Sequence, residues 1–126
     1  MERKKFFVLE ALDEPSDIFN AVKTFHLENE RNTRTAELPT NIGKPVKSFL
    51  VDTAHPNGNE VHTLTEDGLI FIQNEKTNKI VTFLFARPEQ ISRYFHNLGE
   101  EVPKNKLYNN MMKCACVNQR YGKNMK

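Results

Sequence analysis

The run from Glu60 to Ala86 constrains the fold more than any other part of the chain, because two turn signals separate three strand-like segments. "EVHTLT" and "LIFIQN" flank "EDG", and an Asp-Gly pair between such segments is a strong signal for a β-hairpin. "KIVTFLFA" is nearly continuous in apolar, β-branched and aromatic residues, as in a strand buried on both faces. "NEKTN" supplies the second turn. The run therefore predicts three consecutive antiparallel strands.

Helical patterns lie on both sides of this run. Residues 16–30 carry apolar side chains at helical spacing, after Pro15 and Ser16 at a plausible helix start. "RPEQISRYFHNLG" has Pro88 at a helix-start position and ends in a glycine, and "KNKLYNNMMKCACVNQRYG" predicts one more helix. Two short apolar segments stay open: residues 3–12 form either a strand or an apolar lead-in, and "VKSFLVDTA" forms either a strand or a helix.

This order of elements predicts an α+β fold. We expect a small antiparallel β-meander of three or four strands, packed with N-terminal and C-terminal helices. The 126 residues are enough for one ordinary domain and too few for two, so residues 1–126 are predicted to form a single domain. No apolar run approaches the ~18 residues of a membrane span, and the start of the chain does not look like a signal peptide. The expected location is the cytoplasm, without membrane attachment.

The net charge of +2 conceals a basic C-terminal segment, residues 104–126. No acid follows Glu101, whereas cations continue to the end of the chain. The predicted nucleic-acid-binding residues are Lys104, Lys106, Lys113, Arg120 and Lys123. Clustered cations attract a polyanion such as RNA. The alternative is a solvated, partly frayed tail without a partner.

Candidate catalytic residues gather around the predicted strands. His55, Glu60 and His62 precede or enter the first strand, and Arg87 follows the third. Metal-independent RNA cleavage requires a base, an acid and a cation that stabilises the phosphorane. Imidazole serves either proton role near neutral pH, and arginine presents paired donors to phosphate. Spacing alone does not bring these side chains together.

Each of these residues also has a structural interpretation. His62 would be a half-exposed sheet residue, and His55 would belong to a turn with "NG". Glu60 would be a solvated charge at a strand edge, and Arg87 a surface residue before a helix. The helical histidines, His26 and His96, are interpreted as structural because aromatic residues adjoin them.

The two cysteines stand as "CAC", Cys114 and Cys116. Side chains two residues apart on a helix diverge, which makes a disulfide between them geometrically poor. A zinc site can be drawn from these thiols with His55 and His62, but nothing in the spacing is diagnostic. We predict reduced thiols, no bound metal and no cofactor.

The pattern His-Pro-Asn-Gly-x-Glu-x-His, followed by "DGLIFIQNEKTNKIVTFLFARPEQISRYF", resembles the core of small proteins encoded by phages and mobile elements of Firmicutes. It is also similar, more loosely, to the sheet of the ribonuclease superfold that includes barnase, RelE-type toxins, EndoU and colicin ribonuclease domains. The resemblance covers residues 55–95. It implies RNA cleavage without a metal, with His55 or His62 as acid or base and Arg87 at the phosphate. It also implies a phosphate contact from Thr82, a residue whose structural alternative is a core β-former.

The resulting hypothesis is an RNA-acting protein, specifically a metal-independent endoribonuclease, a hydrolase of toxin or phage-effector type. Its expected partners are RNA and a protein, either an antitoxin or a host enzyme. The alternative is a non-enzymatic protein, either a phage-encoded inhibitor or a nucleic-acid-binding regulator. The basic C-terminal segment fits both hypotheses.

Overall fold

The computed structural model describes residues 7–29, 42–53 and 58–120. Within these ranges the chain forms a five-stranded sheet and three helices. The strands are β1 (Phe7–Ala11), β2 (Pro45–Asp52), β3 (Glu60–Thr65), β4 (Leu69–Asn74) and β5 (Ile80–Phe85). The helices are α1 (Ile18–Asn29), α2 (Pro88–His96) and α3 (Lys106–Arg120).

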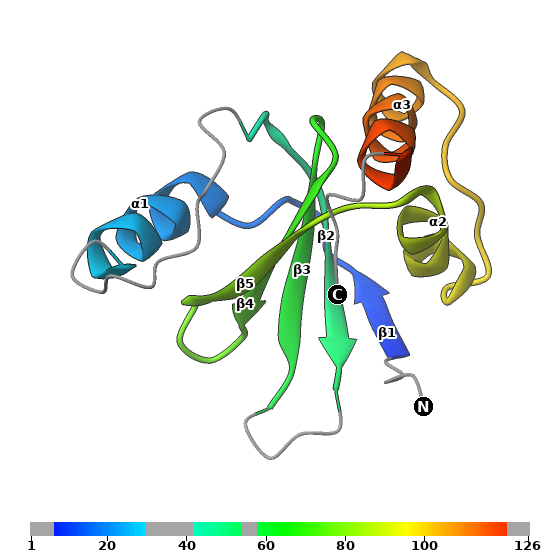
Figure 1. Ribbon diagram of the computed structural model, residues 1–126. Coiled ribbons are helices and arrows are strands. Elements are labelled where there is room, and N and C mark those ends of the chain that lie inside the picture. The colour runs from blue at the N-terminus through cyan, green and yellow to red at the C-terminus, as the bar shows by residue number, and fades with distance from the viewer. Residues whose placement is uncertain (1–6, 30–41, 54–57, 121–126) are drawn as a thin grey trace, which may run out of the picture.

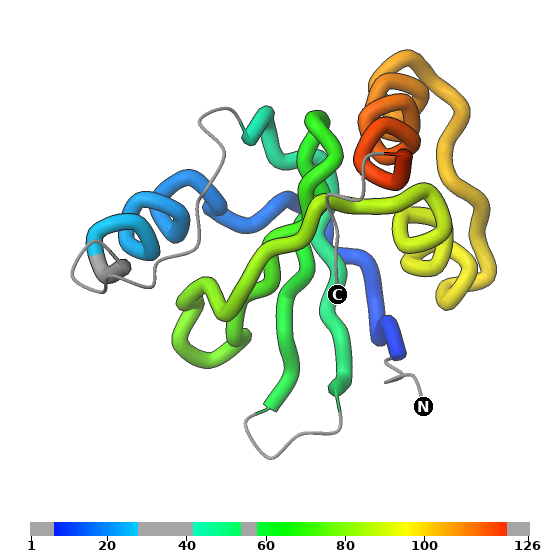
Figure 2. The backbone as a smooth tube through the Cα atoms, viewed as in Figure 1, coloured from blue at the N-terminus to red at the C-terminus, as the bar shows by residue number. Residues whose placement is uncertain are grey.

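All neighbouring strands are antiparallel, in the order β1-β2-β3-β4-β5, so the chain passes up and down through adjacent strands (Figure 2). α1 is inserted between β1 and β2. The predicted α+β class is confirmed. The meander has five strands where three or four were expected, because the open segments near residues 3–12 and 46–54 both form strands.

The β3–β4 turn is the hairpin that "EDG" predicted. The backbone N–H of Gly68 donates to the carbonyl of Thr65 at 3.1 Å, and Gly68 has a φ of +80°. Two reasons exclude a side chain at residue 68. The positive φ disfavours any residue with a Cβ, and a Cβ would lie only 2.9 Å from the Cβ of Cys114. The turn thus needs glycine both for its backbone and for the close approach of α3.

The β4–β5 turn is fixed by asparagines. The side-chain oxygen of Asn74 accepts the backbone N–H groups of Lys76 and Thr77 at 2.9 and 3.0 Å. Asn78 then takes the left-handed conformation, with φ +61°. Asparagine is one of the few residues other than glycine that adopts this region readily, so "NEKTN" turns as predicted.

The main core lies between one face of the sheet and the pair α2 and α3, which stand together on that side (Figure 1). The fully buried ring of Phe49 stacks on Tyr94 with centroids 5.1 Å apart, and Phe95 meets it edge-on at 5.3 Å. Leu64 and Ile70 from the middle strands and Met111 from α3 complete this layer. The prediction that β5 is buried on both faces was wrong: none of its six residues is fully buried, because β5 is an edge strand of the sheet.

A smaller core lies on the opposite face, beneath α1 (Figure 1). Ile18 and Val22, at helical spacing, pack with Leu69 and Phe71 of β4 and with Ile42. Phe83 and Phe85 of β5 are only partly buried against this cluster. One helix thus covers this face incompletely.

α3 is attached to the sheet by a buried amide rather than frayed from it. The side-chain nitrogen of Asn118 donates to the carbonyls of Gly68 and Ala86 at 3.1 and 2.9 Å. Residues 106–120 are therefore a packed helix, which corrects the alternative of a frayed tail for that range. Among the described residues, no helix combines the length and apolar character that crossing a membrane requires.

Candidate functional site

A chain of hydrogen bonds links a carboxylate, an imidazole and a phenol on the α2 side of the sheet. Glu60 and His62 lie two residues apart on β3 and therefore share a face. The Nε2 atom of His62 lies 3.0 Å from Oε1 of Glu60, and its Nδ1 atom lies 2.7 Å from the hydroxyl of Tyr94. We call these three residues the Glu60–His62–Tyr94 relay.

The bonding pattern assigns the tautomer of the imidazole. An ionised carboxylate only accepts hydrogen bonds, so Nε2 of His62 carries a proton and donates it to Glu60. In the neutral imidazole Nδ1 is then the acceptor, and the hydroxyl of Tyr94 donates to it. Every polar atom of the imidazole is thereby satisfied.

Tyr94 is the member of the relay that the sequence did not reveal. It lies on α2, stacks on Phe49 and meets the ring of His62 edge-on, with centroids 5.6 Å apart. Burial raises the pKa of its hydroxyl well above the usual range, the negative charge of Glu60 raises the pKa further, and Arg93 partly offsets both. The only signal in the sequence was a tyrosine within an apolar helix stripe, since a buried hydroxyl needs a partner.

The imidazole is shielded from solvent. The side chain of His62 is 6% exposed, whereas that of Glu60 is 26% exposed. The expectation of a half-exposed histidine was therefore wrong, because α2 covers that part of β3. Of the two side chains, the carboxylate of Glu60 is therefore the more accessible to solvent.

Thr82 lies on the same face as His62, two strands away. Ile72 pairs with both residues across the sheet, which places Thr82 at about 10 Å from His62 for two strand spacings. Burial falls along this row, from the enclosed Phe49 through His62 to the exposed Thr82. The alternative of a core β-former is wrong for Thr82, because the helices do not cover this end of β5.

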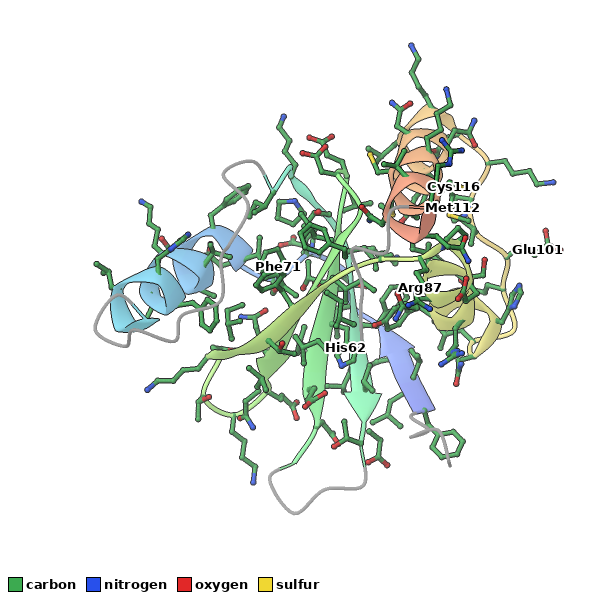
Figure 3. All side chains as sticks on the ribbon, viewed as in Figure 1. His62, Phe71, Arg87, Glu101, Met112 and Cys116 are labelled. Carbon is green, nitrogen blue, oxygen red and sulfur yellow. The ribbon has the colours of Figure 1, made fainter. Side chains whose placement is uncertain are left out.

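Arg87 lies at the start of α2, outside the strands that hold His62 and Thr82. Five residues separate it from Thr82, which is at most roughly 16 Å of extended chain. Figure 3 shows it beside α2, whereas His62 lies within the sheet. The side-chain oxygen of Gln90 accepts its backbone N–H at 2.9 Å, and its guanidinium lies 3.9 Å from Glu89 at the surface. Arg87 is thus the residue that precedes α2, and the helix begins at Pro88, as the sequence predicted.

The other predicted site residues fall in separate places. His55 and Lys123 lie outside the described residues. Exposed positions before or on α3 hold the four described cations of the predicted nucleic-acid-binding set, Lys104, Lys106, Lys113 and Arg120.

His26 and His96 are both exposed, so the structural interpretation of these histidines was wrong. Helical spacing near aromatic residues did not distinguish the buried side of each helix from its outer side.

Both cysteines are free thiols. Cys114 is half-buried, and burial together with nearby Asp67 raises the pKa of its thiol. Cys116 is exposed on the outside of α3 (Figure 3). Within residues 7–29, 42–53 and 58–120, no group of three or more His, Cys, Asp or Glu side chains is placed to hold a metal ion. Both nitrogens of His62 are already engaged in the relay.

A second polar network, which the sequence analysis did not predict, lies on the α1 face. The hydroxyl of Ser16 lies 2.7 Å from that of Thr63 and donates to Oε1 of Gln73 at 2.7 Å. Ser48 bonds to Thr63 at 2.8 Å and accepts the backbone N–H of Ser16 at 2.9 Å. The signals were polar residues within apolar strands. We call these four residues the hydroxyl–amide network.

No protein-family model, curated protein or solved structure significantly matches this chain.

Proposed function

We propose that this protein binds RNA through the outer face of α3. The observation that carries the proposal is a basic stripe formed by Lys106, Lys113 and Arg120, all of them exposed. Residues seven apart on a helix differ in direction by only about 20° and are separated by about 10.5 Å along its axis. The three cations therefore line one side of α3 over about 21 Å.

The surroundings of the basic stripe favour a polyanion. α3 contains no acidic residue, and exposed Asn109 and Asn110 lie between the first two cations. The negative charge of Asp67 raises the pKa of the Cys114 thiol on α3. Cys114 lies about a quarter turn around the helix from Lys113, so this acid faces a different side of α3 from the basic stripe. Lysine and arginine at regular intervals neutralise phosphates and release counterions, which gives affinity without base recognition.

The test is fluorescence anisotropy with a labelled single-stranded RNA at about 50 and about 200 mM salt. Three phosphate contacts on a single strand give a salt slope of about −2, so affinity should fall about twentyfold between these conditions. Simultaneous Lys106→Glu, Lys113→Glu and Arg120→Glu substitutions should abolish binding at the lower salt concentration.

The matched control reverses three exposed lysines elsewhere, with Lys23→Glu, Lys44→Glu and Lys76→Glu. This control changes the net charge by the same amount. If both triple variants lose affinity equally, net charge and not the basic stripe is responsible, and the proposal fails. Absence of RNA binding by the unaltered protein would also refute it.

A metal-independent endoribonuclease of toxin or phage-effector type is the second candidate function. It is favoured by the Glu60–His62–Tyr94 relay on a sheet face that opens toward Thr82. In this function Glu60 would exchange the proton with RNA, and the buried imidazole would orient its carboxylate. The binding function is preferred because neither nitrogen of His62 is available to a substrate hydroxyl.

Growth arrest and RNA cleavage distinguish the two functions. An endoribonuclease should arrest growth of the expressing cells and cleave RNA in the presence of chelator. Glu60→Gln should slow cleavage by about 10²–10⁴-fold, whereas Glu89→Gln, at a surface position on α2, should not. RNA that is bound but left intact by the purified protein would support the binding function alone.

A further inference from the structure

A cleft of about 520 Å³ lies between α1 and the β4–β5 turn. Asp17 and Asn20, beside the start of α1, line one wall. Thr77 and Lys79, from the turn, line the opposite wall. In Figure 1 α1 stands on the other side of the sheet from α3, so the cleft is separate from the proposed RNA-binding surface.

One buried glutamine connects the two walls. Gln73 is 3% exposed, and its Oε1 accepts the hydroxyl of Ser16 just before α1. Its Nε2 donates to the backbone carbonyl of Asn78 in the turn at 3.2 Å. Ser16 is bonded in turn to Thr63, so the hydroxyl–amide network holds in place its two members that line the cleft, Ser16 and Gln73. A binding site whose walls are already held in place loses little free energy to ordering when a ligand enters.

The exposed side of the cleft combines a paired carboxylate and amide with an apolar surface. The amide nitrogen of Asn20 donates to Oδ2 of Asp17 at 2.7 Å, which fixes both groups relative to each other. Asp17 presents further acceptor capacity, and the Asn20 nitrogen has a second proton to donate. Phe25 and Ile80 supply apolar lining. The lining carries one acid and one base, Asp17 and Lys79, which favours a ligand of low net charge.

We propose that this cleft binds a small ligand that carries a vicinal diol beside an apolar face. Two adjacent hydroxyls match the Asp17–Asn20 pair, because each can donate to the carboxylate or accept from the amide. A carboxylate that accepts a ribose hydroxyl is a recurrent form of nucleotide recognition. The apolar face of the ligand would lie against Phe25. Ribonucleosides and neutral pyranose sugars both have this chemistry, and the volume accommodates either class.

The test is a titration of isotopically labelled full-length protein, followed by NMR chemical shifts, with adenosine, 2′-deoxyadenosine and methyl α-D-glucopyranoside. 2′-Deoxyadenosine lacks one hydroxyl that would bond to a charged group, so its affinity should be at least about tenfold lower than that of adenosine. Asp17→Asn should weaken binding of adenosine or of the glucoside by a similar factor. Asp13→Asn, at an exposed position outside the cleft, is the matched control and should leave affinity unchanged.

A second variant guards against a folding defect at the start of α1. Ala21 lines the cleft, and Ala21→Gln would place a longer side chain in it while keeping a good helix former. Binding of adenosine identifies a ribonucleoside site, and binding of the glucoside alone identifies a sugar site. The proposal is overturned if neither ligand shifts the lining residues, if 2′-deoxyadenosine binds as well as adenosine, or if both cleft variants bind normally. None of these outcomes depends on RNA binding by α3.

Discussion

The two faces of the sheet differ in how their polar groups are enclosed. Between the sheet and the pair α2 and α3, twelve of the described residues form the buried cluster, and Tyr94 of the relay is one of them. Beneath α1 the buried cluster has five described residues, and two members of the hydroxyl–amide network, Ser16 and Gln73, line an open cleft. Two helices seal one face and one helix leaves the other accessible. The sealed face should therefore contribute more to stability, and the open face is better suited to a ligand.

The largest expected effect is that of truncating the central aromatic residue of each cluster. Phe49→Ala should cost about 4–5 kcal/mol and Phe71→Ala about 3 kcal/mol of unfolding free energy. Phe49 contacts two rings of α2, at 5.1 and 5.3 Å, in a sealed layer that cannot relax into the cavity. Phe71 has a partly buried neighbour, Phe83, that can move. Urea denaturation measures both, and equal losses would contradict the contrast between the faces.

Removal of the imidazole of His62 should have the second-largest effect on stability. His62→Ala should cost about 2–3 kcal/mol, because it leaves the hydroxyl of Tyr94 without its acceptor in a buried site. His96→Ala, at an exposed position on α2, is the control and should stay within about 0.5 kcal/mol. A His62 variant as stable as the control would show that the relay contributes nothing to the sealed face.

Alkaline pH should weaken the sealed face in particular. Burial raises the pKa of Tyr94 and of Tyr108 above the value of 10.0 expected in the unfolded chain. Below that value both states are protonated and the stabilisation is complete. Above it the unfolded chain loses the proton first, so stability falls as the pH rises, by up to about 1.4 kcal/mol per pH unit for Tyr94.

Urea denaturation of the Tyr94→Phe variant between about pH 9 and about pH 11 measures this effect. The pH slope of its stability should be shallower than that of the unaltered protein. An unchanged slope would mean that Tyr94 titrates equally in both states.

The smallest effect should come from the network of the open face. Gln73→Leu removes the bonds to Ser16 and Asn78, but water from the cleft can replace them. The expected cost is about 1 kcal/mol, at the lower end for a broken buried hydrogen bond. If urea denaturation shows a larger cost than for His62→Ala, the α1 face is closed more tightly than the comparison implies.

Several features of the fold were predictable from local sequence. Asp67-Gly68 and "NEKTN" specify turns, and Pro88 specifies a helix start, because each depends on the backbone preferences of a few adjacent residues. Ile18 and Val22 of α1 are buried, but helical spacing alone did not identify the buried side, since Phe19 on the same helix is 48% exposed. The sequence showed that cations gather in the segment that forms α3. The geometry of the helix then placed three of them along one side of it.

The partners of the polar residues were decided by the tertiary structure. His62 meets Tyr94 across 32 residues and Ser16 meets Gln73 across 57, and no periodic pattern encodes such pairs. A bulge near Ile80 also moves that residue to the α1 face, away from Thr82, although strict alternation places them together. The sequence by itself determined turns and helix starts, because these follow from interactions between neighbouring residues. The relay, the network and the cleft required the packing of distant elements, whose relative positions local preferences do not set.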